Sequence, residues 1–117
     1  MLDLLWFLLL GHFLGDFALQ SDRVALLKQT SHRTLTYHVA VYTSTVALFL
    51  YIGLTYNNSS MFFTFYTALA LTFIFVEHWF QDLVKVTKFN GSKQSFFFDQ
   101  AVHVLILFLL RIVVYSD

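Results

Sequence analysis

The sequence predicts an all-α membrane protein in which four transmembrane helices form one bundle, and three observations carry this prediction. Of the 117 residues, 58% are hydrophobic and only 12% are charged, whereas a soluble domain has roughly 25% charged residues. Fifteen phenylalanines are more than a soluble domain of this size can bury. Four segments are also apolar enough and long enough to cross a bilayer, which takes about 20 residues.

The four apolar segments cover residues 2–20, 35–56, 61–84 and 96–114. Backbone groups inside a bilayer must find partners within their own segment, so each segment is expected to be a helix. The first segment lacks the basic start and the small-residue cleavage site of a signal peptide, so we expect it to stay in the protein. The chain, residues 1–117, is expected to form a single domain.

Basic residues are confined to two of the three connections and to the end of the last segment. The connections carry Arg23, Lys28, Arg33, Lys85, Lys88 and Lys93. Since cytoplasmic loops are enriched in Lys and Arg, the first and third connections are expected in the cytoplasm. Both termini are then expected on the periplasmic side.

Three segments each carry a histidine and an aspartate four residues apart, and residues at this spacing share a helix face. The pairs are His12 with Asp16, His78 with Asp82, and Asp99 with His103. The order within the pair reverses where the direction of the helix reverses. At a rise of 1.5 Å per residue, the histidines form one layer roughly 10 Å from the cytoplasmic helix ends, with the aspartates roughly 5 Å deep. We therefore expect one polar pocket near the cytoplasmic side, which His38 joins from the second segment.

This constellation favours a metal site. Three histidines with carboxylates suit zinc first, and manganese or iron if more oxygens bind. The expected ligands are His12, Asp16, His78, Asp82, Asp99 and His103. The alternative is that each pair is a local hydrogen bond that fixes helix packing. Ionisable groups inside a membrane usually mark function, and three pairs at one depth favour a functional role.

Other residues are expected to serve the same pocket. The residues expected to act in catalysis are Asp16, Asp82, Asp99 and Lys85, with a spare carboxylate as general base. Lys85 shares a face with His78 and Asp82, so it could meet an anionic head group, pair with Asp82, or extend to the interface. The residues expected to support the ligands by hydrogen bonds are His38, Gln20 and Gln100, and the alternative for both glutamines is capping at the membrane interface. Glu77 is expected to point about 100° away from this face, where it would pair with a neighbouring helix, or to join the site by rotation of the helix. Gly11 and Gly15 are expected to allow close helix packing.

Two features suggest that the first and second halves are repeated helical hairpins. HFLGDF at residues 12–17 aligns with HWFQDL at residues 78–83, and His12 and His38 are separated by nearly the same distance in sequence as His78 and His103. Such parallel repeats occur in some transporters. The repeat is imperfect, because Thr34 stands where the second half has an aspartate.

The stretches GHFLGDFALQSD, EHWFQDLVK and FFFDQAVH resemble the bacterial membrane protein family called domain of unknown function 3307. The matching positions are His12, Asp16, Phe17, Gln20, His78, Asp82, Lys85, Asp99, Gln100 and His103. The resemblance implies a bacterial inner-membrane protein and leaves its function open. The His/Asp pattern is also similar to that of inner-membrane proteins described as metal-dependent hydrolases.

We therefore expect a metal-dependent hydrolase that acts on lipid-linked or amphiphilic phosphates or esters, with membrane lipid as its partner and no organic cofactor. A homo-oligomer is compatible with the sequence. A net charge of zero gives no nucleic-acid footprint, and the absence of cysteine excludes thiolate ligands. Two alternatives stay open: an ion or proton transporter or channel-like protein, and a structural membrane subunit with a polar packing layer.

Overall fold

The computed structural model describes residues 3–18, 21–28, 30–58, 64–88 and 93–114, and these contain helices and no strand. The elements are α1 (Leu4–Phe13), a π-helical turn η1 (Leu14–Ala18), α2 (Asp22–Leu27), α3 (His32–Tyr56), α4 (Phe65–Lys88) and α5 (Lys93–Val114). The prediction of an all-α fold is confirmed. Among the described residues, α3 is the one helix both long enough and apolar enough to cross a membrane.

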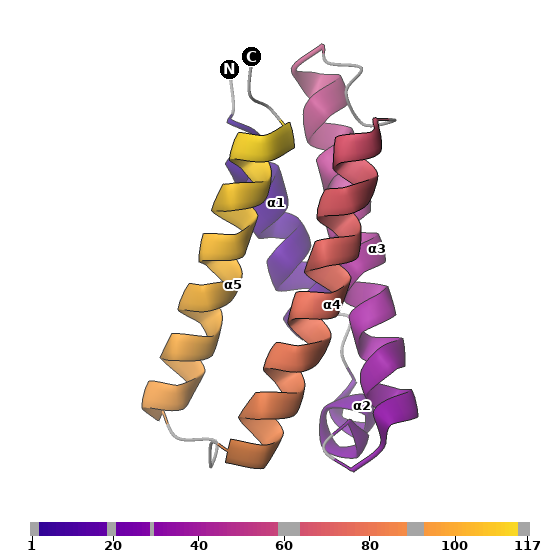
Figure 1. The fold of residues 1–117 in the computed structure, drawn as a ribbon, viewed down its shortest axis with the longest axis vertical. Helices are drawn as coiled ribbons and strands as arrows, with labels where there is room; N and C mark the ends of the chain where they lie inside the picture. Colours follow the sequence, from indigo (N-terminus) through magenta and orange to yellow (C-terminus); the bar gives the residue numbers. More distant parts are fainter. Residues whose placement is uncertain (1–2, 19–20, 29, 59–63, 89–92, 115–117) are drawn as a thin grey trace.

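Four helices enclose one interior. α1 packs against α3, α3 against α4, α4 against α5, and α5 back against α1. The three long helices stand roughly side by side, with both termini at one end and the short α2 at the other (Figure 1). The whole measures 42 × 27 × 22 Å.

The first predicted segment differs from the structure in a way that affects the site. A single helix was expected over residues 2–20, but α1 ends at Phe13 and the chain continues as the π-helical turn η1. A π turn holds more residues than an α turn, so the side chains after it point in new directions, and such turns are frequent at functional sites. The four-residue spacing of His12 and Asp16 therefore does not place them on one α-helical face.

The helix boundaries also extend beyond the apolar segments. Residues 21–34 were expected as a loop, yet they contain α2 and the start of α3. Serine side chains begin both helices: Ser21 Oγ accepts from the Val24 N–H at 3.1 Å and Ser31 Oγ from the Thr34 N–H at 3.2 Å. These caps satisfy amides that would otherwise be unpaired. α4 and α5 likewise continue past the predicted ends at residues 84 and 96.

The interior has an apolar part towards the termini and a polar part towards α2. The apolar part comprises Leu4, Leu8, Tyr42, Val46, Leu50, Leu54, Ile74, Leu107 and Leu110. The predicted close packing at Gly11 and Gly15 is confirmed. A Cβ at Gly11 would lie 3.2 Å from Val46 Cα, and one at Gly15 would lie 3.1 Å from Tyr42 Cα. Hydrogen at these positions lets α1 and η1 lie directly on the α3 backbone.

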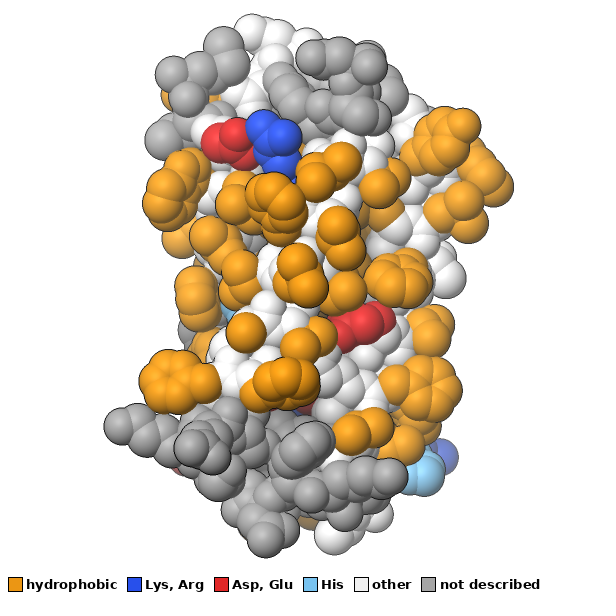
Figure 2. Space-filling model, turned by 60° about the vertical axis from the view of Figure 1, so that its left-hand side comes forward, with side chains coloured by type: hydrophobic (Ala, Val, Ile, Leu, Met, Phe, Trp, Pro, Cys, Tyr) orange, Lys and Arg blue, Asp and Glu red, His pale blue; other side chains and the backbone are white. Residues whose placement is uncertain are grey.

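The outside of the bundle is largely apolar. Large hydrophobic side chains from every long helix are exposed, among them Trp6, Phe65, Phe73, Phe80, Phe98 and Phe108. In the view of Figure 2, hydrophobic side chains cover most of the described surface between the two ends of the molecule. At the end with the termini, Arg111 donates two hydrogen bonds to Asp3, of 3.0 and 2.7 Å, and so ties α5 to the start of α1.

Candidate metal centre

Seven ionisable side chains lie together in the polar part of the interior, and we call them the His/Asp cluster. Each is at most 6% exposed. The members are His12, Asp16, His38, His78, Asp82, Asp99 and His103. The members come from α1, η1, α3, α4 and α5. Each of the four helical segments around the interior, with η1 counted as the continuation of α1, therefore contributes at least one side chain.

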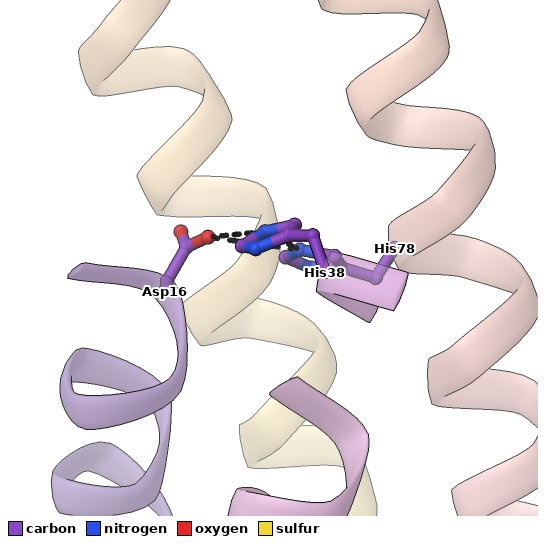
Figure 3. A group of neighbouring side chains, drawn as sticks. All are labelled: Asp16, His38 and His78. Carbon is purple, nitrogen blue, oxygen red and sulfur yellow. Dashed lines mark hydrogen bonds and ion pairs between the residues drawn. The ribbon is translucent and has the colours of Figure 1, made fainter. Parts of the chain in front are cut away.

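Four atoms form the centre of the cluster. His38 Nε2 lies 3.2 Å from Asp16 Oδ1 and 3.4 Å from Asp82 Oδ2. His78 Nε2 lies 3.6 and 3.5 Å from the same two oxygens, and the two Nε2 atoms are 3.3 Å apart. Figure 3 shows Asp16, His38 and His78 pointing towards one another from η1, α3 and α4.

The distances among Asp16 Oδ1, His38 Nε2 and His78 Nε2 match three edges of a tetrahedral metal site. When ligand atoms lie about 2.0–2.1 Å from a tetrahedral zinc ion, they are about 3.3–3.4 Å from one another. The three distances are 3.2, 3.6 and 3.3 Å. The same contacts are ion pairs if the histidines are protonated, so the cluster can hold a divalent cation or neutralise its own carboxylates with protons.

The cation next to this centre is Lys28. Its Nζ donates to Asp82 Oδ2 at 3.3 Å, and the side chain is 8% exposed. The sequence analysis placed Lys28 in a loop and assigned the cationic role to Lys85. The side chain of Lys85, like the whole of Gln20, lies outside the described residues. The sequence does hold a helix start signal at Ser21 and Asp22, which the expectation of a loop overlooked. The short helix α2 that begins there returns Lys28 to the bundle.

His12 has its own partners. Its Nε2 and the Gln100 Oε1 are 2.8 Å apart, and its Nδ1 is 2.8 Å from the Tyr42 hydroxyl. Since an amide oxygen only accepts, Nε2–H donates to Gln100. Both ring nitrogens of His12 therefore have hydrogen-bond partners. The role of His12 as a metal ligand remains a prediction.

Tyr42 is a site residue that the sequence analysis missed. It is 2% exposed, and its ring stacks on His78 with centroids 4.0 Å apart and planes 12° apart. It therefore holds His12 by its hydroxyl and His78 by its face. The sequence spacing could have identified Tyr42, because it follows His38 by four residues, which is also the spacing within the three His/Asp pairs.

Asp99 and His103 form a second group on α5. His103 Nε2 lies 3.4 Å from Asp99 Oδ1, and Gln81 donates to the same oxygen at 2.9 Å. Gln100 donates to Asp99 Oδ2 at 3.1 Å and to Asp16 Oδ2 at 3.3 Å, which gives it the supporting position expected from the sequence. Glu77 does not simply face away from the cluster, because its Oε1 lies 3.9 Å from His103 Nδ1.

Three sets of residues in the described part of the chain bring three ligand atoms within 4.8 Å of one another. They are Asp16, His38 and His78; His78, Asp82 and His103; and Asp16, Asp99 and His103. Five of the six ligands expected from the sequence belong to these sets. His38, expected as a supporting residue, belongs to one of them as a candidate ligand.

The comparison with known families agrees with the motifs. The family model described as protein of unknown function (DUF3307) matches residues 4–117. The chain belongs to the DUF3307 family. The resemblance seen in the three histidine-containing stretches is thereby confirmed over nearly the whole length. No curated protein and no solved structure matches this DUF3307 chain.

The Lys28–Asp82 ion pair is expected to contribute to the free energy of unfolding. Lys28→Met should lower the free energy of unfolding of the metal-free protein by about 3–5 kcal/mol, because the buried carboxylate loses its cation. The measurement is unfolding in detergent after treatment with a chelator. The control is the double variant Lys28→Met/Asp82→Asn, which removes both charges and should recover most of the loss. Equal stability of Lys28→Met and wild type would contradict the importance of this pair.

Proposed function

We propose that this DUF3307 protein crosses the bacterial inner membrane four times, binds a divalent metal ion in its His/Asp cluster, and hydrolyses lipid-linked or amphiphilic phosphates or esters. The observation that carries the proposal is the spacing of one oxygen from Asp16 and one nitrogen each from His38 and His78, which fits three corners of a tetrahedral metal site. Zinc fits this donor set first, with manganese and iron next.

The membrane location is supported by helix length and by the apolar exterior. α3, α4 and α5 have 25, 24 and 22 residues, and at 1.5 Å per residue each exceeds the hydrocarbon thickness of about 30 Å. α1 and η1 are shorter, a mismatch that a bilayer accommodates by local thinning. Exposed apolar surface on this scale is rare in soluble monomers. The basic connections favour a cytoplasmic position for the α2 end and periplasmic termini.

The ring geometry supports two repeated hairpins. Exchange of α1 with α4 and of α3 with α5 maps the pair His12–His103 onto the pair His78–His38. The ring centroids are 5.6 Å apart in the first pair and 5.4 Å in the second, and the interplanar angles are 48° and 43°. In this proposal the cluster lies on the axis that relates the two hairpins.

Catalysis is supported by the position of Asp82. Catalytic zinc sites use three protein ligands and leave a fourth position to water. Asp16, His38 and His78 supply three ligands. Asp82 Oδ2 lies beside them, 3.4 Å from His38 Nε2 and 3.5 Å from His78 Nε2, and Lys28 donates to the same oxygen. In the proposed reaction Asp82 takes a proton from the attacking water and returns it to the leaving alcohol. Lys28 is the described cation nearest to an anionic substrate group.

Two other functions compete with hydrolysis. Ion or proton transport is less well supported, because the described buried residues between the cluster and the termini are mainly apolar, including Leu4, Leu8, Leu50 and Leu54. The buried polar side chains there, Thr45 and Thr67, are not ionisable. A purely structural polar layer would use the same His/Asp contacts as ion pairs between protonated histidines and carboxylates. The structural function predicts no bound metal, so metal content separates it from the proposed one.

The proposal predicts a stoichiometric metal and a turnover that needs Asp82. Protein purified in mild detergent without chelators should contain about one or more zinc, manganese or iron ions per chain by elemental analysis, and His38→Ala/His78→Ala should lose metal. In a screen of lipid phosphates and carboxylic esters, Asp82→Asn should retain metal and lower kcat about 10²–10⁴-fold.

His32→Ala is the matched control, because His32 is an exposed histidine on α3 outside the His/Asp cluster. It should behave as wild type in both measurements. Wild-type protein without metal would contradict the metal site. Full turnover in Asp82→Asn would contradict the role of Asp82 as the base.

The four-span topology predicts different access to the two ends of the bundle. Since the chain has no cysteine, single cysteines can be placed at exposed Asn58, after α3, and at exposed Asp22, in α2. A membrane-impermeant maleimide applied to intact cells whose outer membrane has been permeabilised should label Asn58→Cys. It should label Asp22→Cys only after the inner membrane is opened. Equal labelling of the two variants would contradict the topology.

A further inference from the structure

Asp16 belongs to two of the three sets of candidate ligands. With His38 and His78 it forms the centre described above, and with Asp99 and His103 it forms another set. Its two oxygens face different neighbours. Oδ1 lies 3.2 Å from His38 Nε2, whereas Oδ2 accepts from the Gln100 amide at 3.3 Å. Because Gln100 also donates to Asp99, one side-chain amide holds the two carboxylates of the second set.

His103 has a ring nitrogen in the position of a ligand. The residue is 2% exposed, and its Nε2 makes no hydrogen bond within the described part of the chain, although Asp99 Oδ1 lies 3.4 Å away. The opposite nitrogen, Nδ1, faces Glu77 at 3.9 Å. Histidines that bind a metal through one nitrogen commonly donate from the other to a carboxylate, which fixes the ring. Glu77 lies on the side of His103 from which such a carboxylate would act, although 3.9 Å is longer than a hydrogen bond.

The charges of the cluster can also balance a second cation. Asp16, Asp82 and Asp99 are buried acidic side chains, and Lys28 is the fixed cation beside them in the described part of the chain. Two negative charges therefore lack a fixed counter-charge, and buried charges must be balanced. One divalent ion supplies that balance. A second divalent ion adds two positive charges, which an ionised Glu77 beside His103 and one hydroxide ion would neutralise.

We propose that the cluster is a binuclear centre in which Asp16 is shared by two metal ions. The first ion is held with His38 and His78, and the second with Asp99 and His103. This inference rests on the metal binding in the proposed function and narrows its substrate class. Paired ions about 3.5–4 Å apart stabilise both the attacking and the leaving oxygen in phosphoryl transfer. Such a centre suits phosphate esters, because the attacking and the leaving oxygen of a phosphate ester can each lie next to one ion.

Metal stoichiometry in a set of variants tests this proposal. Wild-type protein loaded with Mn²⁺ alone and freed of excess ion should hold two ions per chain. His103→Asn and His38→Asn should each hold one, and Asp16→Asn should hold none or bind far more weakly. The exposed His32→Asn control should hold two. One ion in wild type, or two in His103→Asn, would overturn the binuclear centre and leave a single-metal hydrolase intact. No ion in wild type would overturn both proposals.

Electron paramagnetic resonance gives a readout that a structural role of His103 would not change. Two Mn²⁺ ions that share a carboxylate should give a broad spectrum with magnetic coupling, and His103→Asn should give the six-line spectrum of isolated Mn²⁺. If His103→Asn fails to fold, as judged by gel filtration and circular dichroism, Asp99→Asn replaces it with the same expected spectrum. An uncoupled spectrum in wild type with two bound ions would overturn the sharing of Asp16.

Discussion

The constraint on which the structure depends is the balance of charge inside the bundle. Asp16, Asp82 and Asp99 are each less than a tenth exposed, and Lys28 is the buried lysine beside them. An unpaired carboxylate in such surroundings costs several kcal/mol, so these groups persist only with counter-charges. The bundle supplies four histidines at the same level. If protons on the histidines complete the charge balance, the cluster is a structural polar layer. If metal ions complete it, the cluster is a site for catalysis.

The charged groups come together because the first helix departs from regular α-helical geometry. η1 interrupts the first helix, and Gly11 and Gly15 let this interrupted segment lie on the α3 backbone so closely that a Cβ would be only 3.2 Å from Val46 Cα or 3.1 Å from Tyr42 Cα. Asp16 reaches His38 and His78 from this position. Tyr42 then occupies the space between His12 and His78, with one hydrogen bond and one stacked ring. The π-helical turn, the two glycines and Tyr42 therefore each help to set the direction in which a side chain of the His/Asp cluster points.

The convergence of the polar residues could be predicted from the sequence, because the four-residue spacing and the depth along each helix depend only on regular helix geometry. That reasoning placed Asp16, His78, Asp82, Asp99 and His103 together. It also placed His12 and His38 in this pocket, where the structure has them, but the π turn after His12 changes the direction of the chain, and no spacing rule reveals this turn. Lys28 and Tyr42 were missed because their roles depend on contacts between distant segments, Lys28 with Asp82 and Tyr42 with His12.

The central claim is that His38, His78 and Asp16 bind a metal ion directly, and X-ray absorption at the zinc edge of the purified, zinc-loaded protein tests it most directly. The account predicts nitrogen and oxygen ligands at about 2.0–2.1 Å, with the outer scattering of two or more imidazole rings and no sulfur. Zinc with only oxygen ligands and no imidazole scattering, or a protein that retains no zinc, would show that the His/Asp cluster is held together by its own ion pairs.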